Sequence, residues 1–168
     1  DVGVAEPLGQ LLPANQMFVR QCYLDIFPSV WGKFKQKHRV AITLTGTPGI
    51  GKSVFGLLFT LELVRFLKAS AESNADFGQG LNGRIVYEHN KGVESNSTYY
   101  LIDTSKDTIF CTRDEPLSWL LDKGTFLIKD GPCKDSDVAC SLLWLSSPRV
   151  GSFQKAGESA TGSFILPP

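Results

Sequence analysis

Eight consecutive residues constrain the fold of this chain more than any other feature. They run from Gly46 to Ser53, read GTPGIGKS and fit the pattern GxxxxGK[ST]. The run before them, 40–45, reads VAITLT; its β-branched residues predict a strand that ends at a glycine turn. The run after them, 53–68, is apolar on nearly every side and predicts a helix that is covered by other elements. This strand, turn and helix give the context in which the pattern forms a phosphate-binding loop.

The residue types of the loop explain this expectation. Its glycines permit backbone angles that other residues avoid, so that successive amides can turn toward one phosphate. The side chain of Lys52 supplies a positive charge for the β- and γ-phosphates, and the Ser53 hydroxyl is an oxygen ligand suited to Mg²⁺. The start of the following helix adds a partial positive charge. The predicted nucleotide-binding residues are Gly46, Thr47, Pro48, Gly49, Ile50, Gly51, Lys52, Ser53, Val54 and Ser147.

A second apolar run, FLIKD, ends at Asp130 and is followed by Gly131. An acid at the end of a strand near the loop holds Mg²⁺ through water in nucleotide-hydrolysing enzymes of this kind. We therefore predict that Asp130 and Ser53 form the metal site, with a simple strand-end turn as the alternative. Lys129 interrupts the apolar run, and it must either extend to solvent or pair with an acid.

Hydrolysis also needs a group that orients the attacking water, and Gly131 cannot provide one. We expect Glu88, at the end of the predicted strand 84–89, to substitute; an ordinary exposed acid is the alternative. Arg149 could reach the γ-phosphate and Ser146 or Ser147 could sense it, although a solvated arginine and turn serines fit the pattern equally well. The predicted catalytic residues are Lys52, Glu88, Asp130 and Arg149.

The remaining segments predict an α/β sandwich. Residues 16–31 have amphipathic helical spacing, in which we expect Pro28 to break the helix or to start a second short turn. The polar, glycine-rich segment 69–82 predicts a surface loop. Strands are predicted at 84–89, 125–130, 139–147 and 163–166, a hairpin at 98–103 and 108–113, and helical turns at 116–122.

Composition excludes several other classes of protein. Seventeen basic and seventeen acidic residues cancel, so bulk charge gives no argument for nucleic acid or for a membrane surface. The longest apolar stretch, 54–67, contains charged residues and is shorter than the ~20 residues of a membrane span. The cysteines Cys22, Cys111, Cys133 and Cys140 form no CxxC pair, so we expect reduced thiols and no zinc site.

Five segments carry a resemblance to a known family: MFVRQCYLDIF, TGTPGIGKSVFG, FLIKDGP, LLWLSSPR and FILPP. Together they resemble the P-loop module of Crinkler-type effectors and their trypanosomal relatives, the retrotransposon hot spot proteins, over about residues 17–168. The resemblance implies a three-layer P-loop NTPase sandwich with a mostly parallel sheet, in strand order 5-1-4-3-2, to which the hairpin is added. It also implies a helical segment, 1–39, packed on a core, 40–168, that ends before a helical lid.

The resemblance also implies a function. By position, Lys52 and Ser53 match the phosphate and Mg²⁺ ligands, Asp130 matches the Walker B acid, and Ser147 and Arg149 match the end of the sensor strand. The implied activity is slow, Mg²⁺-dependent hydrolysis of ATP within a secreted effector that acts in a host nucleus. Host protein or nucleic acid would then be contacted through segments outside this sequence. No translocation leader is visible in it, so delivery cannot be read from these residues.

Two other functions stay open. Gly131, which stands where an acid often follows the metal aspartate, favours a non-catalytic domain in which bound nucleotide supports protein interaction or DNA association. A small-molecule kinase is disfavoured because no arginine-rich lid follows the last strands. The base is not readable from the loop; ATP is favoured by the resemblance, and the guanine-reading pattern NKxD does not occur.

Overall fold

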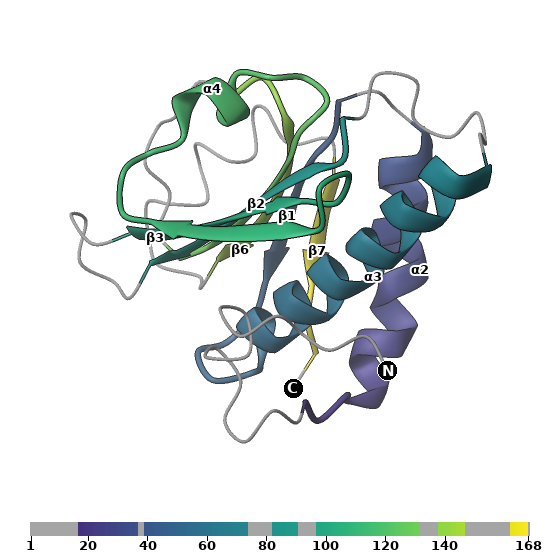
Figure 1. Ribbon diagram of the computed structural model, residues 1–168. Helices are drawn as coiled ribbons and strands as arrows, with labels where there is room; N and C mark the ends of the chain where they lie inside the picture. The colour runs from purple at the N-terminus through teal and green to yellow at the C-terminus, as the bar shows by residue number, and fades with distance from the viewer. Residues whose placement is uncertain are drawn as a thin grey trace.

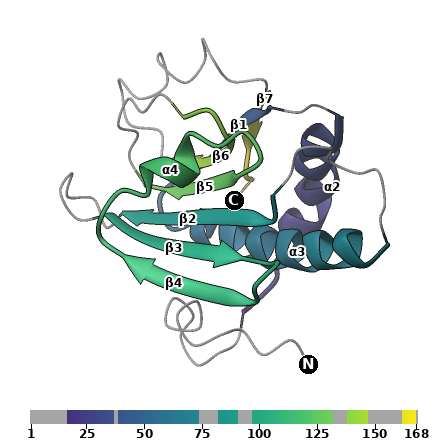
Figure 2. The same ribbon diagram turned by 45° about the horizontal axis from the view of Figure 1, so that its top comes forward.

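The structure is a computed structural model that describes residues 17–36, 39–73, 82–90, 97–131, 138–146 and 162–167. These residues form a mixed α/β fold around one sheet, which confirms the α/β part of the prediction, whereas a mostly parallel sheet was expected. Two long helices, α2 (Gln21–Gln36) and α3 (Lys52–Ser73), lie on one side of the sheet, and the short α4 (Leu117–Leu120) lies on the other (Figures 1 and 2).

The sheet has seven strands in the order β4-β3-β2-β5-β6-β1-β7. Four of the six pairings are parallel and join β2, β5, β6, β1 and β7, whereas β3 and β4 continue the sheet beyond β2 as antiparallel strands. The complete sheet is therefore mixed in direction. Every predicted strand is present, and its ends agree with the prediction to within two residues: β1 (Ala41–Thr45), β2 (Arg84–Asn90), β3 (Ser97–Asp103), β4 (Thr108–Thr112), β5 (Phe126–Asp130), β6 (Ser141–Ser146) and β7 (Gly162–Ile165).

Alternate residues of the central strands fill two separate apolar layers, because successive side chains of a strand point to opposite faces. The larger layer lies between the sheet and the two long helices; Ile85, Tyr87 and Ile128 belong to it. The smaller layer lies under α4 and includes Val86 and Leu127, which are the neighbours of those residues in the chain. This alternation decides which strand residues can face α3 and the loop before it.

Helix α2 corrects one prediction from sequence. It starts at Gln21 and continues through Pro28 to Gln36 without a break. Proline removes a helical hydrogen bond and favours a break, but aromatic side chains on both sides of it pack on the same residue of α3. The ring centroids of Phe27, Trp31 and Phe34 lie 5.7, 5.5 and 5.2 Å from that of Phe59. Tertiary packing thus holds both halves of α2 in one helix.

Helix α3 corrects a second prediction, because it is longer than the apolar run that predicted it. It continues to Ser73, through residues 69–73 that were assigned to a surface loop. This last part contains Ala69 and Ala71, which favour helix but are exposed and carry no apolar pattern. The composition therefore indicated the exposure of Ala69 and Ala71 correctly and the backbone conformation of residues 69–73 wrongly.

Two smaller expectations can also be compared with the described residues. Their helices include none that is long and apolar enough to cross a membrane. Cys22, Cys111 and Cys140 have free thiols, as expected, whereas Cys133 lies outside the described residues. Burial raises the pKa of the Cys140 thiol to about 11, so it is a neutral core residue at physiological pH.

The aromatic contact between α2 and α3 makes a prediction about stability. Phe59 is fully buried, so Phe59→Ala should lower the free energy of unfolding by about 3–5 kcal/mol. Phe110, on β4, is 57% exposed, and Phe110→Ala should cost less than about 1 kcal/mol. Urea unfolding followed by circular dichroism measures both values. Equal losses would show that the contact with α2 is not a main source of stability.

Candidate functional site

The loop 46–53 connects the end of β1 to the start of α3 (Figure 1). Gly49 and Gly51 have φ angles of 79° and 91°, which residues with a side chain rarely adopt. Thr47, Pro48 and Gly49 are exposed, whereas Gly46 and Ile50 are buried. The middle of the loop therefore faces solvent, and its two flanks are fixed in the protein.

The start of α2 holds the loop from outside. Arg20 donates a hydrogen bond to the carbonyl oxygen of Ile50, at 2.8 Å, and the Tyr23 hydroxyl donates to that of Gly51, at 3.1 Å. A Cβ atom added at Gly51 would lie 1.9 Å from the Tyr23 hydroxyl oxygen. Gly51 is thus required both by its backbone angle and by this close approach. Neither Arg20 nor Tyr23 was predicted to belong to the site.

Lys52 is the buried charge of the loop. Its ammonium group donates to the carbonyl oxygens of Gly46, at 2.7 Å, and Thr47, at 2.9 Å, so the side chain folds back over the loop. Burial lowers the pKa of Lys52, and the negative charge of Asp130 acts in the opposite direction. The sequence predicted that these two residues belong to one site, and their charges do interact.

The next two residues differ in exposure. Ser53, in the first turn of α3, is exposed and follows Lys52 directly in the chain. Val54 is half-buried and packs at the edge of the larger apolar layer. Ser53 is therefore accessible to a ligand in the loop, whereas Val54 has a packing contact that explains it without a ligand.

Asp130 ends β5 and is buried beside two residues of β2. Its Oδ2 atom accepts a hydrogen bond from the Tyr87 hydroxyl and lies 3.3 Å from His89 Nδ1. Burial first, and then the charge of Asp130, raise the pKa of Tyr87 well above its ordinary value, so the hydroxyl keeps its proton and remains a donor. The contact follows from the sheet register, in which His89 is opposite Asp130.

The backbone around Gly131 leaves no room for a side chain, which explains why no acid follows Asp130. Its φ angle is 140°, and a Cβ atom there would lie 2.8 Å from Cβ and 3.0 Å from the carbonyl oxygen of Asn90. The carbonyl oxygen of Gly131 also accepts a hydrogen bond from the indole of Trp144, at 2.8 Å. A side chain at this position would collide with the backbone of β2, so a water-orienting acid cannot stand here.

Glu88 does not take the place that the sequence predicted for it. Its Oε2 atom lies 3.2 Å from the ammonium nitrogen of Lys129, and Oε1 accepts a 2.8 Å hydrogen bond from Ser97. Its neighbours Tyr87 and His89 contact Asp130, so alternation along β2 places Glu88 on the opposite face, the one that α4 covers. This ion pair gives Lys129 the acidic partner that a lysine within an apolar strand requires. It also places Glu88 on the opposite face of the sheet from Asp130, so Glu88 cannot orient a water there.

The parallel register places the end of β5, with Asp130, at the same edge of the sheet as the end of β1, where the loop with Lys52 and Ser53 follows. The charge of Asp130 acts on Lys52 across this edge. Two predicted residues, Ser147 and Arg149, lie outside the described residues. Tyr87 and His89 were missed. Their sequence, YEH at the end of a predicted strand, contained a signal, since alternation puts both on the face opposite Glu88.

Comparison with known proteins leaves this site to be interpreted from its own chemistry. No protein-family model, curated protein or solved structure matches the chain.

The pair of Glu88 and Lys129 leads to a prediction that separates a structural from a catalytic role. Both side chains are 5% exposed, so Glu88→Gln leaves a buried lysine without its counter-charge and should cost about 3–5 kcal/mol of unfolding free energy. The double variant Glu88→Gln, Lys129→Met removes both charges and should recover most of this loss. Urea unfolding measures it; a stable Glu88→Gln protein would contradict the assigned pair.

The contact between Gly51 and Tyr23 leads to another prediction. Gly51→Ala should destabilise the protein by about 2 kcal/mol or more, because it combines an unfavourable φ with a clash. Gly49→Ala is the matched control, since its φ is also positive but no atom lies within 4 Å of the added Cβ. Thermal unfolding should show the smaller loss for Gly49→Ala. If the two losses are equal, Tyr23 does not restrain the loop.

Proposed function

We propose that this chain binds the phosphates of a nucleoside triphosphate, with ATP favoured, on the loop 46–53 and hydrolyses it slowly with Mg²⁺. The observation that carries the proposal is the position of Lys52: a buried ammonium group in a glycine turn between β1 and α3, within the field of a strand-end carboxylate, Asp130. A lysine, backbone amides and a helix start that converge on one point form a site for phosphate oxygens.

The hydrogen bonds of Lys52 support this role. Its two acceptors are carbonyl oxygens of the loop itself, Gly46 and Thr47. Phosphate oxygens carry more negative charge than carbonyl oxygens and make stronger hydrogen bonds with an ammonium group. A bound triphosphate can therefore take the lysine over from the loop without leaving its charge unpaired.

The residues present also fit Mg²⁺. The hydroxyl of Ser53, an exposed residue, and the carboxylate of Asp130 are hard oxygen donors, which this ion prefers. Among the described residues there is no cluster of three or more His, Cys, Asp or Glu that could hold a metal alone. Mg²⁺ at a nucleotide needs no such cluster, because phosphate oxygens and water complete its shell. When bound, the ion would neutralise charge on the β- and γ-phosphates.

The strand order supports a P-loop NTPase fold. The five strands joined by parallel pairing lie in the order β7-β1-β6-β5-β2. Counted among themselves along the chain, they read 5-1-4-3-2, the order implied by the resemblance to Crinkler-type modules. The hairpin of β3 and β4 then extends the sheet beyond the β2 edge, as an addition to the five.

The wider biological role rests on the resemblance alone. A Crinkler-type module would act in a host nucleus as part of a secreted effector, and it would contact host protein or nucleic acid through other segments. Within such a protein, ATP and ADP would act as a switch only if they bind two conformations of the module with different affinity.

Nucleotide binding gives the first test of the proposal. ATP with Mg²⁺ should raise the unfolding temperature of the native chain, because a ligand at 100 times its Kd adds about 2.7 kcal/mol of stability. ADP, GTP and Mg²⁺ alone complete the comparison and report the base preference. Lys52→Ala should abolish the shift, since it removes the charged donor for the phosphates.

Phosphate release tests hydrolysis separately. The rate of phosphate release should fall to background in Lys52→Ala and should be strongly reduced in Asp130→Asn. A coupled assay of inorganic phosphate measures both rates. Binding of ATP without release above the Lys52→Ala background would favour the non-catalytic alternative. A nucleotide-independent unfolding temperature would reject the proposed site altogether.

A further inference from the structure

Hydrolysis at this site needs a hydrogen-bond acceptor that holds the attacking water. Gly131 cannot carry one, because the backbone of Asn90 occupies the space of its side chain. Glu88 faces α4 and is paired with Lys129. The described residues nevertheless include another candidate for this role, His89, whose side chain lies beside Asp130.

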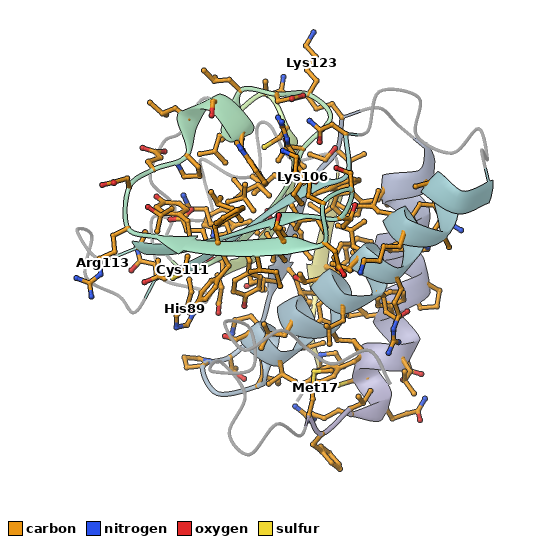
Figure 3. The ribbon with its side chains drawn as sticks, in the orientation of Figure 1. Met17, His89, Lys106, Cys111, Arg113 and Lys123 are labelled. Atoms are coloured by element: carbon orange, nitrogen blue, oxygen red, sulfur yellow. The ribbon has the colours of Figure 1, made fainter. Side chains whose placement is uncertain are left out.

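His89 lies beside the carboxylate of the proposed metal site. It stands near the end of β2, directly opposite Asp130 in the parallel register. Its side chain is 24% exposed, in contrast to the buried Tyr87 on the same face of the strand. Figure 3 shows His89 at the end of the sheet that faces the loop before α3. The ring is therefore anchored at the carboxylate and open on another side.

The contact with Asp130 fixes which ring nitrogen can accept a hydrogen bond. An ionised carboxylate can only accept, so the nitrogen that faces it, Nδ1 at 3.3 Å from Oδ2, carries the hydrogen. In the neutral imidazole the other nitrogen, Nε2, then has a lone pair. The Tyr87 hydroxyl donates to the same Oδ2 atom and holds the carboxylate in place for this contact.

We propose that His89 is a catalytic residue whose Nε2 atom accepts a hydrogen bond from the attacking water; this inference rests on the proposed function. The water oxygen forms a bond to the γ-phosphorus, and the bond from the γ-phosphorus to the β–γ bridging oxygen breaks. The electron pair of that bond stays on the bridging oxygen of ADP. One water proton passes to an oxygen of the released phosphate, so His89 leaves the cycle unchanged.

A catalytic role and a purely structural role of His89 depend on different ring nitrogens. A residue that only holds Asp130 needs Nδ1, whereas a residue that orients water also needs Nε2. Asparagine places its amide nitrogen near the position of Nδ1, and glutamine places its amide oxygen or nitrogen near that of Nε2. His89→Asn therefore keeps the contact with Asp130 and loses the contact with water, whereas His89→Gln keeps the contact with water and loses that with Asp130. Neither amide titrates.

The experiment measures ATP affinity and phosphate release for both variants of the full chain. His89→Asn should bind ATP within about threefold of the native protein and lose about 100-fold in kcat, because water is no longer positioned. His89→Gln should keep kcat within about tenfold of the native value, since its amide can accept from the same water. The difference in kcat at constant affinity identifies the role.

Three results would overturn the inference. One is native kcat in His89→Asn, and another is an equal loss in both variants, which indicates support of Asp130 only. The third is a native protein that binds ATP but releases no phosphate above the Lys52→Ala background. In each of these cases nucleotide binding persists, so they are distinguishable from failure of the proposed function, in which ATP does not change the unfolding temperature of the native protein.

Discussion

The packing of α3 against both the sheet and α2 is the constraint on which the site depends. Phe55 and Phe59 are fully buried and pack against the aromatic side chains of α2, so the start of α3 has a fixed position. The loop before α3 is then held at both flanks, by β1 and by hydrogen bonds from Arg20 and Tyr23. A loop whose ends are fixed holds its glycines at defined positive φ angles, which an isolated peptide would exchange for many others.

The two faces of the sheet separate structural from functional charges. On the face that α4 covers, Glu88 and Lys129 neutralise one another away from solvent. On the face of α3, Asp130 shares one oxygen atom between Tyr87 and His89, and its charge acts on Lys52. Buried charges are costly unless they are paired, and each of these charges has a partner on its own face. The sheet thus separates two networks whose residues are neighbours in the chain.

The sequence predicted much of the fold because its patterns are local. The strands follow from runs of β-branched and apolar residues, and the loop follows from a glycine and lysine pattern between a strand and a helix. Predictions failed where distant residues decide. Pro28 stays within a helix because Phe27 and Trp31 both reach α3, and residues 69–73 remain helical although they carry no apolar signal.

By itself the sequence determined the position of Lys52 in its glycine loop and of Asp130 at a strand end, since both lie in contiguous patterns. Only the tertiary structure decided which side chains join them. Glu88 and His89 are neighbours in one strand, and the side-chain period of two sends one to Lys129 and the other to Asp130. Which face of the strand meets α3 depends on how the helices pack, and adjacent letters in a sequence do not contain that information.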